Sequence, residues 1–160
     1  ALTINTSLTS NGLMQLLANR AVTIAGGTSA APVLVTSSAE GVTLAAATLS
    51  MGAYSAIDAA KVITIATTGD AILGQLNTPL SYAGAGNAPS IVVSAGGVAS
   101  LGAILGNGDG QTTFMTSGAG ASLDLTASNG IGSTTRRLAF NASQLSASTT
   151  DGSIYLQALT

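Results

Sequence analysis

The six carboxylates in this sequence are the side chains best suited to acid–base chemistry. Enzymes that cleave glycans need two carboxylates that face one another across the substrate. Asp124 stands between Leu123 and Leu125, so we expect it to point outward without an acidic neighbour. Two other acids lie among turn-forming residues, and no aromatic platform for sugars accompanies any of them. We therefore predict no catalytic residues and no enzymatic activity. The six acids are Glu40, Asp58, Asp70, Asp109, Asp124 and Asp151.

The chain contains no cysteine and no histidine. This excludes disulfides, thiol nucleophiles and thiolate zinc sites, and it removes the commonest general base and transition-metal ligand. The best remaining metal candidate is Asn107-Gly-Asp109-Gly-Gln111, whose oxygens could bind calcium. However, one carboxylate supplies little charge and the motif does not recur. We therefore expect an ordinary turn there, with no metal ligands and no cofactor-binding residues.

Two further segments have the composition of corners, namely Thr67-Thr-Gly-Asp70 and Thr149-Thr-Asp-Gly152. We expect the aspartate in each to cap its own backbone, as Asp does in turns. The doublet Arg136-Arg137 could bind a sulfated glycan or a carboxylate, although an exposed strand or loop pair is the simpler interpretation. Nucleic-acid binding requires clustered basic residues, and the chain has only four in total, so no nucleic-acid partner is expected.

The composition points to β structure with many turns. Charged residues make up 6% of the chain, whereas a typical soluble domain has about 25%. Threonine, valine and isoleucine favour strands, and glycine favours corners. The sequence has 21 Thr, 19 Ser and 20 Gly, but only 3% aromatic residues. Such a chain builds its surface from small hydroxyl side chains and its core from aliphatic ones.

A pair of apolar residues separated by one residue recurs along the whole chain. The first members are separated by about 20 residues early in the chain and by about 30 later, as in solenoid proteins whose coils carry loop insertions. We expect insertions near 77–90 and 105–121, where Pro and Gly gather. The pairs are Val22/Ile24, Val42/Leu44, Ile63/Ile65, Ile91/Val93, Leu123/Leu125 and Ile154/Leu156.

These repeats predict a right-handed parallel β-helix of about five to six coils, covering residues 1–160 as a single solenoid segment of a longer repetitive protein. Coils stacked about 4.8 Å apart place equivalent residues above one another. We expect one continuous inner stack and an outward threonine row of Thr23, Thr43 and Thr64, which breaks at Val92, Asp124 and Tyr155. The inner stack would contain Ile24, Leu44, Ile65, Val93, Leu125 and Leu156.

Other folds remain open at this point. A β-sandwich also has short alternating strands, a membrane β-barrel needs longer strands and aromatic girdles, and a helical fold could use the leucines near residues 12 to 19. Even within a solenoid we allow one short helix at 12–19. We expect further short apolar strands within each coil, including one at Val98/Leu101.

The order of motifs in residues 61–160 resembles the repeat regions of filamentous-haemagglutinin-like exoproteins, the large adhesins of bacterial two-partner secretion systems. The segments that carry this resemblance are VITIATTGDAILGQLN, SIVVSAGGVASLGAILGNGDG and SLDLTASNGIGSTTRRLAFNASQLSASTTDGSIYLQA. The resemblance implies an extended extracellular shaft, exported through an outer-membrane secretion partner and serving adhesion or biofilm formation. Neither the secretion-domain signature nor a toxin domain of that family is recognisable in these residues.

We therefore expect a non-catalytic structural and adhesive segment of a secreted bacterial adhesin, located outside the cell or at its surface. A host or neighbouring-cell receptor or glycan would be bound through the parent adhesin, with the loops at 77–90 and 105–121 as the best contact candidates. Two alternatives stay open. Strand edges at Leu2–Ile4 and Ile154–Leu156 could support end-to-end self-association into a filament, and the threonine row could make the solenoid a module that binds glycan or ice.

Overall fold

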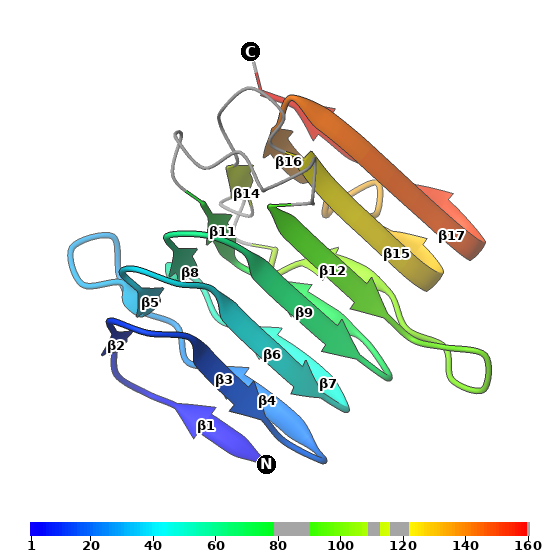
Figure 1. The fold of residues 1–160 in the computed structure, drawn as a ribbon. Helices are drawn as coiled ribbons and strands as arrows, with labels where there is room; N and C mark the ends of the chain where they lie inside the picture. Colours follow the sequence, from blue (N-terminus) through cyan, green and yellow to red (C-terminus); the bar gives the residue numbers. More distant parts are fainter. Residues whose placement is uncertain (79–89, 109–112, 116–121, 160) are drawn as a thin grey trace.

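The strands wind into a parallel β-helix, as predicted from the repeats. The computed structural model describes residues 1–78, 90–108, 113–115 and 122–159, and all paired strands among them are parallel. The chain forms a strand on each of three faces in turn and then returns to the first face, one level higher (Figure 1). Six coils are stacked in this way, and β18 belongs to a seventh.

The three faces are called sheets 1, 2 and 3 here. Sheet 1 contains β3 (Met14–Leu17), β6 (Val42–Ala46), β9 (Ile63–Thr67), β12 (Ile91–Ala95) and the first parts of β15 (Ser122–Ile131) and β17 (Gln144–Ile154). Sheet 2 contains β1 (Leu2–Ile4), β4 (Ala21–Ile24), β7 (Thr48–Met51), β10 (Ala71–Leu73), β13 (Ile104–Gly106) and the last residues of β15 and β17. Because β15 and β17 run around the corner, sheets 1 and 2 are continuous at that end.

Sheet 3 closes the coil on the remaining side. It contains β2 (Leu8–Ser10), β5 (Val33–Ser37), β8 (Ser55–Ala59), β11 (Gln75–Asn77), β14 (Thr113–Met115), β16 (Leu138–Asn141) and β18 (Leu156–Ala158). Parallel strands of this kind need a crossover between them, and here the other two faces of the coil supply it.

Alternation along each strand sends every second side chain into the interior. In β9, Ile63 and Ile65 are fully buried while Thr64 between them is half-buried and faces outward. The pairing register then builds columns, because Ile65 lies over Leu44 and under Val93. Each buried large aliphatic side chain contributes about 1.5–3 kcal/mol to stability. One such column contains Leu16, Leu44, Ile65, Val93, Leu125 and Ala147.

The predicted inner stack is correct for four residues and wrong for two. Leu44, Ile65, Val93 and Leu125 do form consecutive levels of one column. Ile24, however, lies in sheet 2 between Ile4 and Met51. Leu156 lies in sheet 3 and pairs with Leu138. The interior is therefore made of several columns on three faces, and apolar pairs with the same pattern recur on each face.

Two local predictions are also wrong. Residues 14–17 form β3, so no helix occupies 12–19, because pairing with β6 places Leu16 in the core and overrides the local leucine pattern. Val98 and Leu101 form no core strand. They are exposed in a loop that follows β12 and projects from the solenoid (Figure 1). Most of the predicted insertions at 77–90 and 105–121 lies outside the described residues, although β13 and β14 contribute Leu105–Gly106 and Thr113–Met115 to the second.

Candidate functional site

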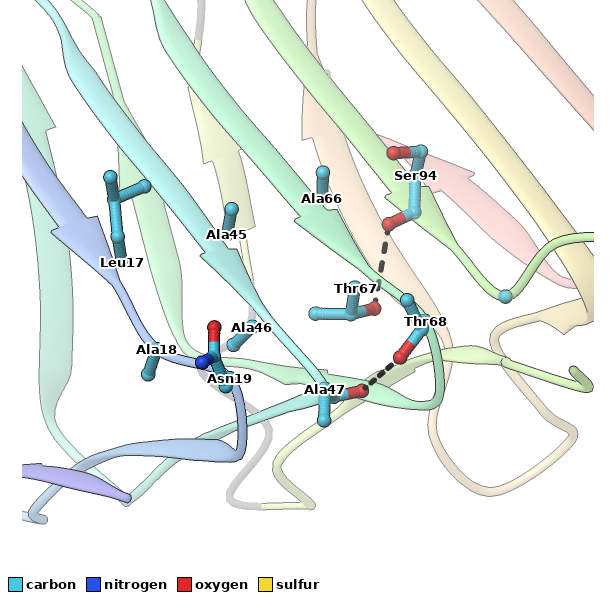
Figure 2. Close-up of a pocket in the computed structure, with 11 residues that line it drawn as sticks. Leu17, Ala18, Asn19, Ala45, Ala46, Ala47, Ala66, Thr67, Thr68 and Ser94 are labelled. Carbon is cyan, nitrogen blue, oxygen red and sulfur yellow. Dashed lines mark hydrogen bonds between the residues drawn. The ribbon is translucent and has the colours of Figure 1, made fainter.

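A shallow groove lies on sheet 1, near the carboxyl ends of β3, β6, β9 and β12. It has a volume of about 530 Å³ (Figure 2). Its floor is the outward column that follows Leu17 through Ala45 and Ala66 to Ser94, one residue for each coil. Its rim includes Asn19 and Thr68 at the corner towards sheet 2. None of the described lining residues carries a titratable side chain, so these residues offer a contact surface without acid–base groups.

Hydrogen bonds between coils hold the rim of this groove. The hydroxyl of Thr67 donates to the carbonyl of Gly69 at 2.7 Å and lies 3.4 Å from the carbonyl of Ser94, one coil above. The hydroxyl of Thr68 lies 3.5 Å from the carbonyl of Ala47, one coil below (Figure 2). These threonine hydroxyls are therefore engaged with the backbone and serve the corner.

The two predicted corners occupy equivalent positions in the solenoid. Thr67 and Thr149 belong to one column, with two alanines, Ala95 and Ala127, between them. In both corners the first threonine donates its hydroxyl to the carbonyl two residues later, from Thr67 to Gly69 and from Thr149 to Asp151. The shared sequence therefore reflects a shared place in the coil.

The predicted role of Asp70 in its corner is wrong. Its carboxylate does not cap its own turn. Instead, Oδ1 accepts a hydrogen bond of 2.8 Å from the backbone N–H of Ala103, in the next coil. The second corner aspartate, Asp151, is exposed and pairs through its backbone with Asn129. The Asp70 carboxylate thus accepts a hydrogen bond from a backbone N–H of the neighbouring coil, just before the strand pairing begins. A backbone donor satisfied in this way stabilises the stack of coils.

The other described acids are dispersed. Glu40 forms an ion pair with Lys61 of the next coil at 2.7 Å, and both side chains are nearly half exposed. Asp58 accepts a hydrogen bond of 2.7 Å from the amide of Asn77. Asp124 points outward between Val92 and Ser146, as predicted for its alternating strand. Asp109 lies outside the described residues.

In the strand register, none of the described acids pairs with another acid on a neighbouring coil. Within the described part of the chain, no three acidic side chains gather where they could hold a metal ion. The calcium candidate is described only in part, since Asp109 and Gln111 lie outside the described residues. Asn107 of that motif donates its side-chain amide to the carbonyl of Gly52 at 2.9 Å. It thus ties its own coil to a corner two coils below.

Arg136 and Arg137 are exposed in the turn between β15 and β16. They line a hollow of about 320 Å³ together with Gly108, Thr134 and Gln157. None of the described residues that line this hollow is acidic. Guanidinium groups suit sulfate or carboxylate ligands, and binding of such an anion stays a prediction.

The predicted threonine row is correct only in part. Thr43 and Thr64 are register partners on sheet 1, and Val92 and Asp124 continue their row, as expected. Thr23 lies on sheet 2, where it pairs with Thr3 and Ser50. Tyr155 lies between β17 and β18, outside this row. The outward row of sheet 1 therefore has only two threonines in succession.

The sequence did not reveal the projecting loop, Gly97–Leu101. Its base is a close contact between Gly96 and Gly102, where no side chain would fit. The hydroxyl of Ser128, one coil above, donates to the carbonyl of Ser100 at 3.0 Å and accepts from the N–H of Gly102 at 2.8 Å. The loop is thus tied to the solenoid at its base, and the fully exposed Val98 lies near its tip. The sequence feature that could have indicated this loop is Ala95-Gly96-Gly97, directly before Val98.

Comparison with models of known protein families, with curated proteins and with solved structures finds no match for this chain. Among the described residues, no helix has the length and apolar character needed to span a membrane.

Proposed function

We propose that this chain is a structural, non-catalytic shaft segment of a secreted bacterial filamentous adhesin. The observation that carries the proposal is the set of aliphatic columns that continues through every described coil, from Leu16 to Ala147 in sheet 1. A solenoid of this kind is stiff because each coil is bonded to the next along all three faces. The resemblance of residues 61–160 to adhesin repeats supports the same assignment.

The role of such a shaft is to hold a binding element away from the cell that displays it. Polar side chains near the corners of the coils support a role as a shaft, because several of them bond one coil to the next. Asp70 bonds Ala103, Lys61 pairs with Glu40, and Ser128 holds Ser100. The same proposal includes export through an outer-membrane partner and an extracellular location. It also includes a receptor or glycan that the parent adhesin recognises.

A display experiment tests it. The chain is placed between an outer-membrane anchor and a head domain of known ligand, and adhesion of the cells to that ligand is measured. A shaft requires folding, so Ile65→Asp should abolish adhesion, whereas Thr43→Ser with Thr64→Ser should leave it unchanged. The isolated chain, without the head, should bind neither a glycan array nor ice. Binding by the isolated chain that Thr43→Ser with Thr64→Ser abolishes would contradict the proposal and favour a binding module.

A second candidate, self-assembly into a filament, is favoured by the distribution of exposed large apolar side chains. Of the nine in the described residues, six lie in the two outermost levels of the solenoid. Among the described residues, the strands at these two levels have one backbone edge without a partner, and such edges accept further strands. A second copy stacked end to end would cover both. The six are Leu8, Leu13, Leu17, Leu145, Ile154 and Leu159.

Sedimentation of the 160-residue chain over a range of concentrations separates the two candidates. Filament assembly predicts growth in mass with concentration, and Leu13→Lys with Ile154→Lys should suppress it. Val98→Lys with Leu101→Lys is the matched control, because it removes exposed apolar surface away from the ends. A chain that stays monomeric at all concentrations, or one that the control variant disperses equally, would contradict end-to-end assembly.

A further inference from the structure

Three asparagines in the described residues precede glycine, and their surroundings differ. They are Asn11, Asn107 and Asn129. In an Asn-Gly pair the backbone nitrogen of the glycine can attack the side-chain carbonyl carbon, Cγ, of the asparagine and close a five-membered ring. The reaction needs a polarised carbonyl, a free leaving nitrogen and a backbone that can move. Each requirement can be compared with the hydrogen bonds of the three sites.

At Asn11 the carbonyl is polarised. This residue is exposed in the corner between β2 and β3, and its Oδ1 accepts a hydrogen bond of 3.1 Å from the hydroxyl of Ser38. A donor aimed at a carbonyl oxygen stabilises the negative charge that grows there during attack. The nitrogen that would leave, Nδ2, has no hydrogen-bond partner among the described residues.

The attacking group at this site is also positioned. The N–H of Gly12 donates to the hydroxyl oxygen of Ser10 at 3.1 Å, which gives its proton a route towards solvent. Apart from the adjacent residues of the chain, no atom lies within 4 Å of the place where a Cβ of Gly12 would stand. That side of Gly12 is therefore open, which favours the backbone rotation that ring closure requires.

The other two sites are restrained. Asn107 donates Nδ2, the leaving nitrogen, to the carbonyl of Gly52 at 2.9 Å, and its own N–H bonds the carbonyl of Leu73. Asn129 lies within β15, where its N–H bonds the carbonyl of Gly102. The next N–H, that of Gly130, bonds the hydroxyl of Thr149 at 2.9 Å. The hydroxyl bond of Gly130 resembles that of Gly12, so it does not distinguish the two sites. At Asn129 the difference is the strand pairing with Asp151, and at Asn107 it is the bonded leaving nitrogen; either must be broken before the ring can close.

We propose that Asn11-Gly12 is a site of self-modification, at which asparagine converts to aspartate and isoaspartate by way of a cyclic imide. The nitrogen of Gly12 forms a bond to Cγ of Asn11, its proton is lost to solvent, and Nδ2 leaves as ammonia. Water then opens the imide at either carbonyl, so that one water is consumed and one ammonia released. No oxidant, reductant or enzyme takes part.

The isoaspartyl product changes the corner that it occupies, because its backbone carries one additional methylene. In the unmodified chain, the hydroxyl of Ser37 donates to the carbonyl of Gly12 at 2.8 Å, and the N–H of Ser38 donates to the carbonyl of Ser10. A longer backbone displaces both carbonyls from these donors. Modification therefore loosens the first coil and adds a negative charge there.

The test follows the three peptides by mass spectrometry while the folded chain is incubated at mildly alkaline pH. Freeing one restrained residue costs an amount that corresponds to about a tenfold change in rate. We therefore expect Asn11 to react at least about tenfold faster than Asn107 or Asn129. In denaturant, where all three lose their surroundings, the rates should converge. Faster reaction at either restrained site, or equal rates in the folded chain, would overturn the proposal.

Ser38→Ala tests the polarising hydroxyl. A hydrogen bond of this kind corresponds to about 2–10-fold in rate, so reaction at Asn11 should slow by that factor in the folded chain and not in denaturant. Ser50→Ala is the matched control, since Ser50 is exposed on β7 and should leave the rate unchanged. An unchanged rate in Ser38→Ala would overturn the role of this hydroxyl.

Discussion

Truncation of Ile65 gives the sharpest test of the inward and outward assignment, because Thr64 beside it offers a matched control. Ile65 is fully buried, with Leu44 below and Val93 above in its column. Ile65→Ala removes three carbon atoms from this column and leaves a cavity, since the neighbouring coils are held in place by their own hydrogen bonds. Substitutions of this type cost about 2–5 kcal/mol.

Thr64→Ala changes the outward side of the same strand. It removes a half-exposed hydroxyl and methyl group whose neighbours are Thr43 and Val92. Its cost is limited to strand preference and cross-strand contact, about 1 kcal/mol or less. The free energies of unfolding of the two variants should therefore differ by at least about 1–4 kcal/mol, measured by urea unfolding followed by circular dichroism.

Aspartate at the same two positions widens the difference. In Ile65→Asp an unpaired carboxylate would enter an apolar column, and the combined cost approaches the whole stability of about 5–15 kcal/mol of a folded domain. Thr64→Asp places its carboxylate in water, so the chain should stay folded. Equal losses for Ile65→Ala and Thr64→Ala, or a folded Ile65→Asp together with an unfolded Thr64→Asp, would refute the assignment.

Three further predictions follow from single contacts. Gly102→Ala should lower the melting temperature, because its Cβ would strike the backbone of Gly96 and Gly69 at a cost of about 1–3 kcal/mol, whereas Gly12→Ala, in open space, should leave it unchanged. Asp70→Ala should cost about 1 kcal/mol and speed hydrogen exchange at the Ala103 amide, while Asp70→Asn, which keeps an acceptor, should cost less; equal exchange in both would refute the bond. Lys61→Met should cost less than about 1 kcal/mol, and high salt should remove the difference from wild type; a difference that persists in high salt would contradict a solvent-screened pair.

The sequence is sufficient to predict the fold where strands of one sheet carry the same short pattern. Leu44, Ile65, Val93 and Leu125 were assigned to one column because the intervals of 21, 28 and 32 residues between them each correspond to one full coil. A coil can lengthen by a loop without any change in its inward residues. The alternation itself, which comes from backbone geometry, therefore survives the insertions.

The face on which a strand lies could not be predicted in the same way. The interval of 20 residues between Val22 and Val42 resembles one coil, yet it joins sheet 2 to sheet 1, because the coil that contains β4 carries a loop at residues 25–32. An apolar pair has the same appearance on all three faces. The predicted threonine row was wrong at Thr23 for the same reason, since Thr23 lies on a different face from Thr43.

The contacts of polar residues were also beyond local inspection. Asp70 bonds Ala103 and Asn107 bonds Gly52, and both bonds join residues that are far apart in the sequence. Turn preferences describe what a residue does within its own corner, and they do not indicate which coil lies above or below. Likewise, the exposure of Val98 depends on the close contact of Gly96 with Gly102, which brings together two residues that no repeat pattern connects.

Parallel stacking in the observed register is the central claim, and the absence of cysteine makes it directly measurable. Thr43→Cys and Thr64→Cys would place two thiols on register partners of adjacent coils. Their Cα atoms lie on neighbouring strands about 4.8 Å apart, which is within the range for a disulfide. Thr23→Cys with Thr43→Cys, on different sheets, should not link within one molecule. Mild oxidation followed by non-reducing electrophoresis should show an internal disulfide in the first pair alone. An internal disulfide in the second pair, with the first fully reduced, would contradict the coil register on which this account depends.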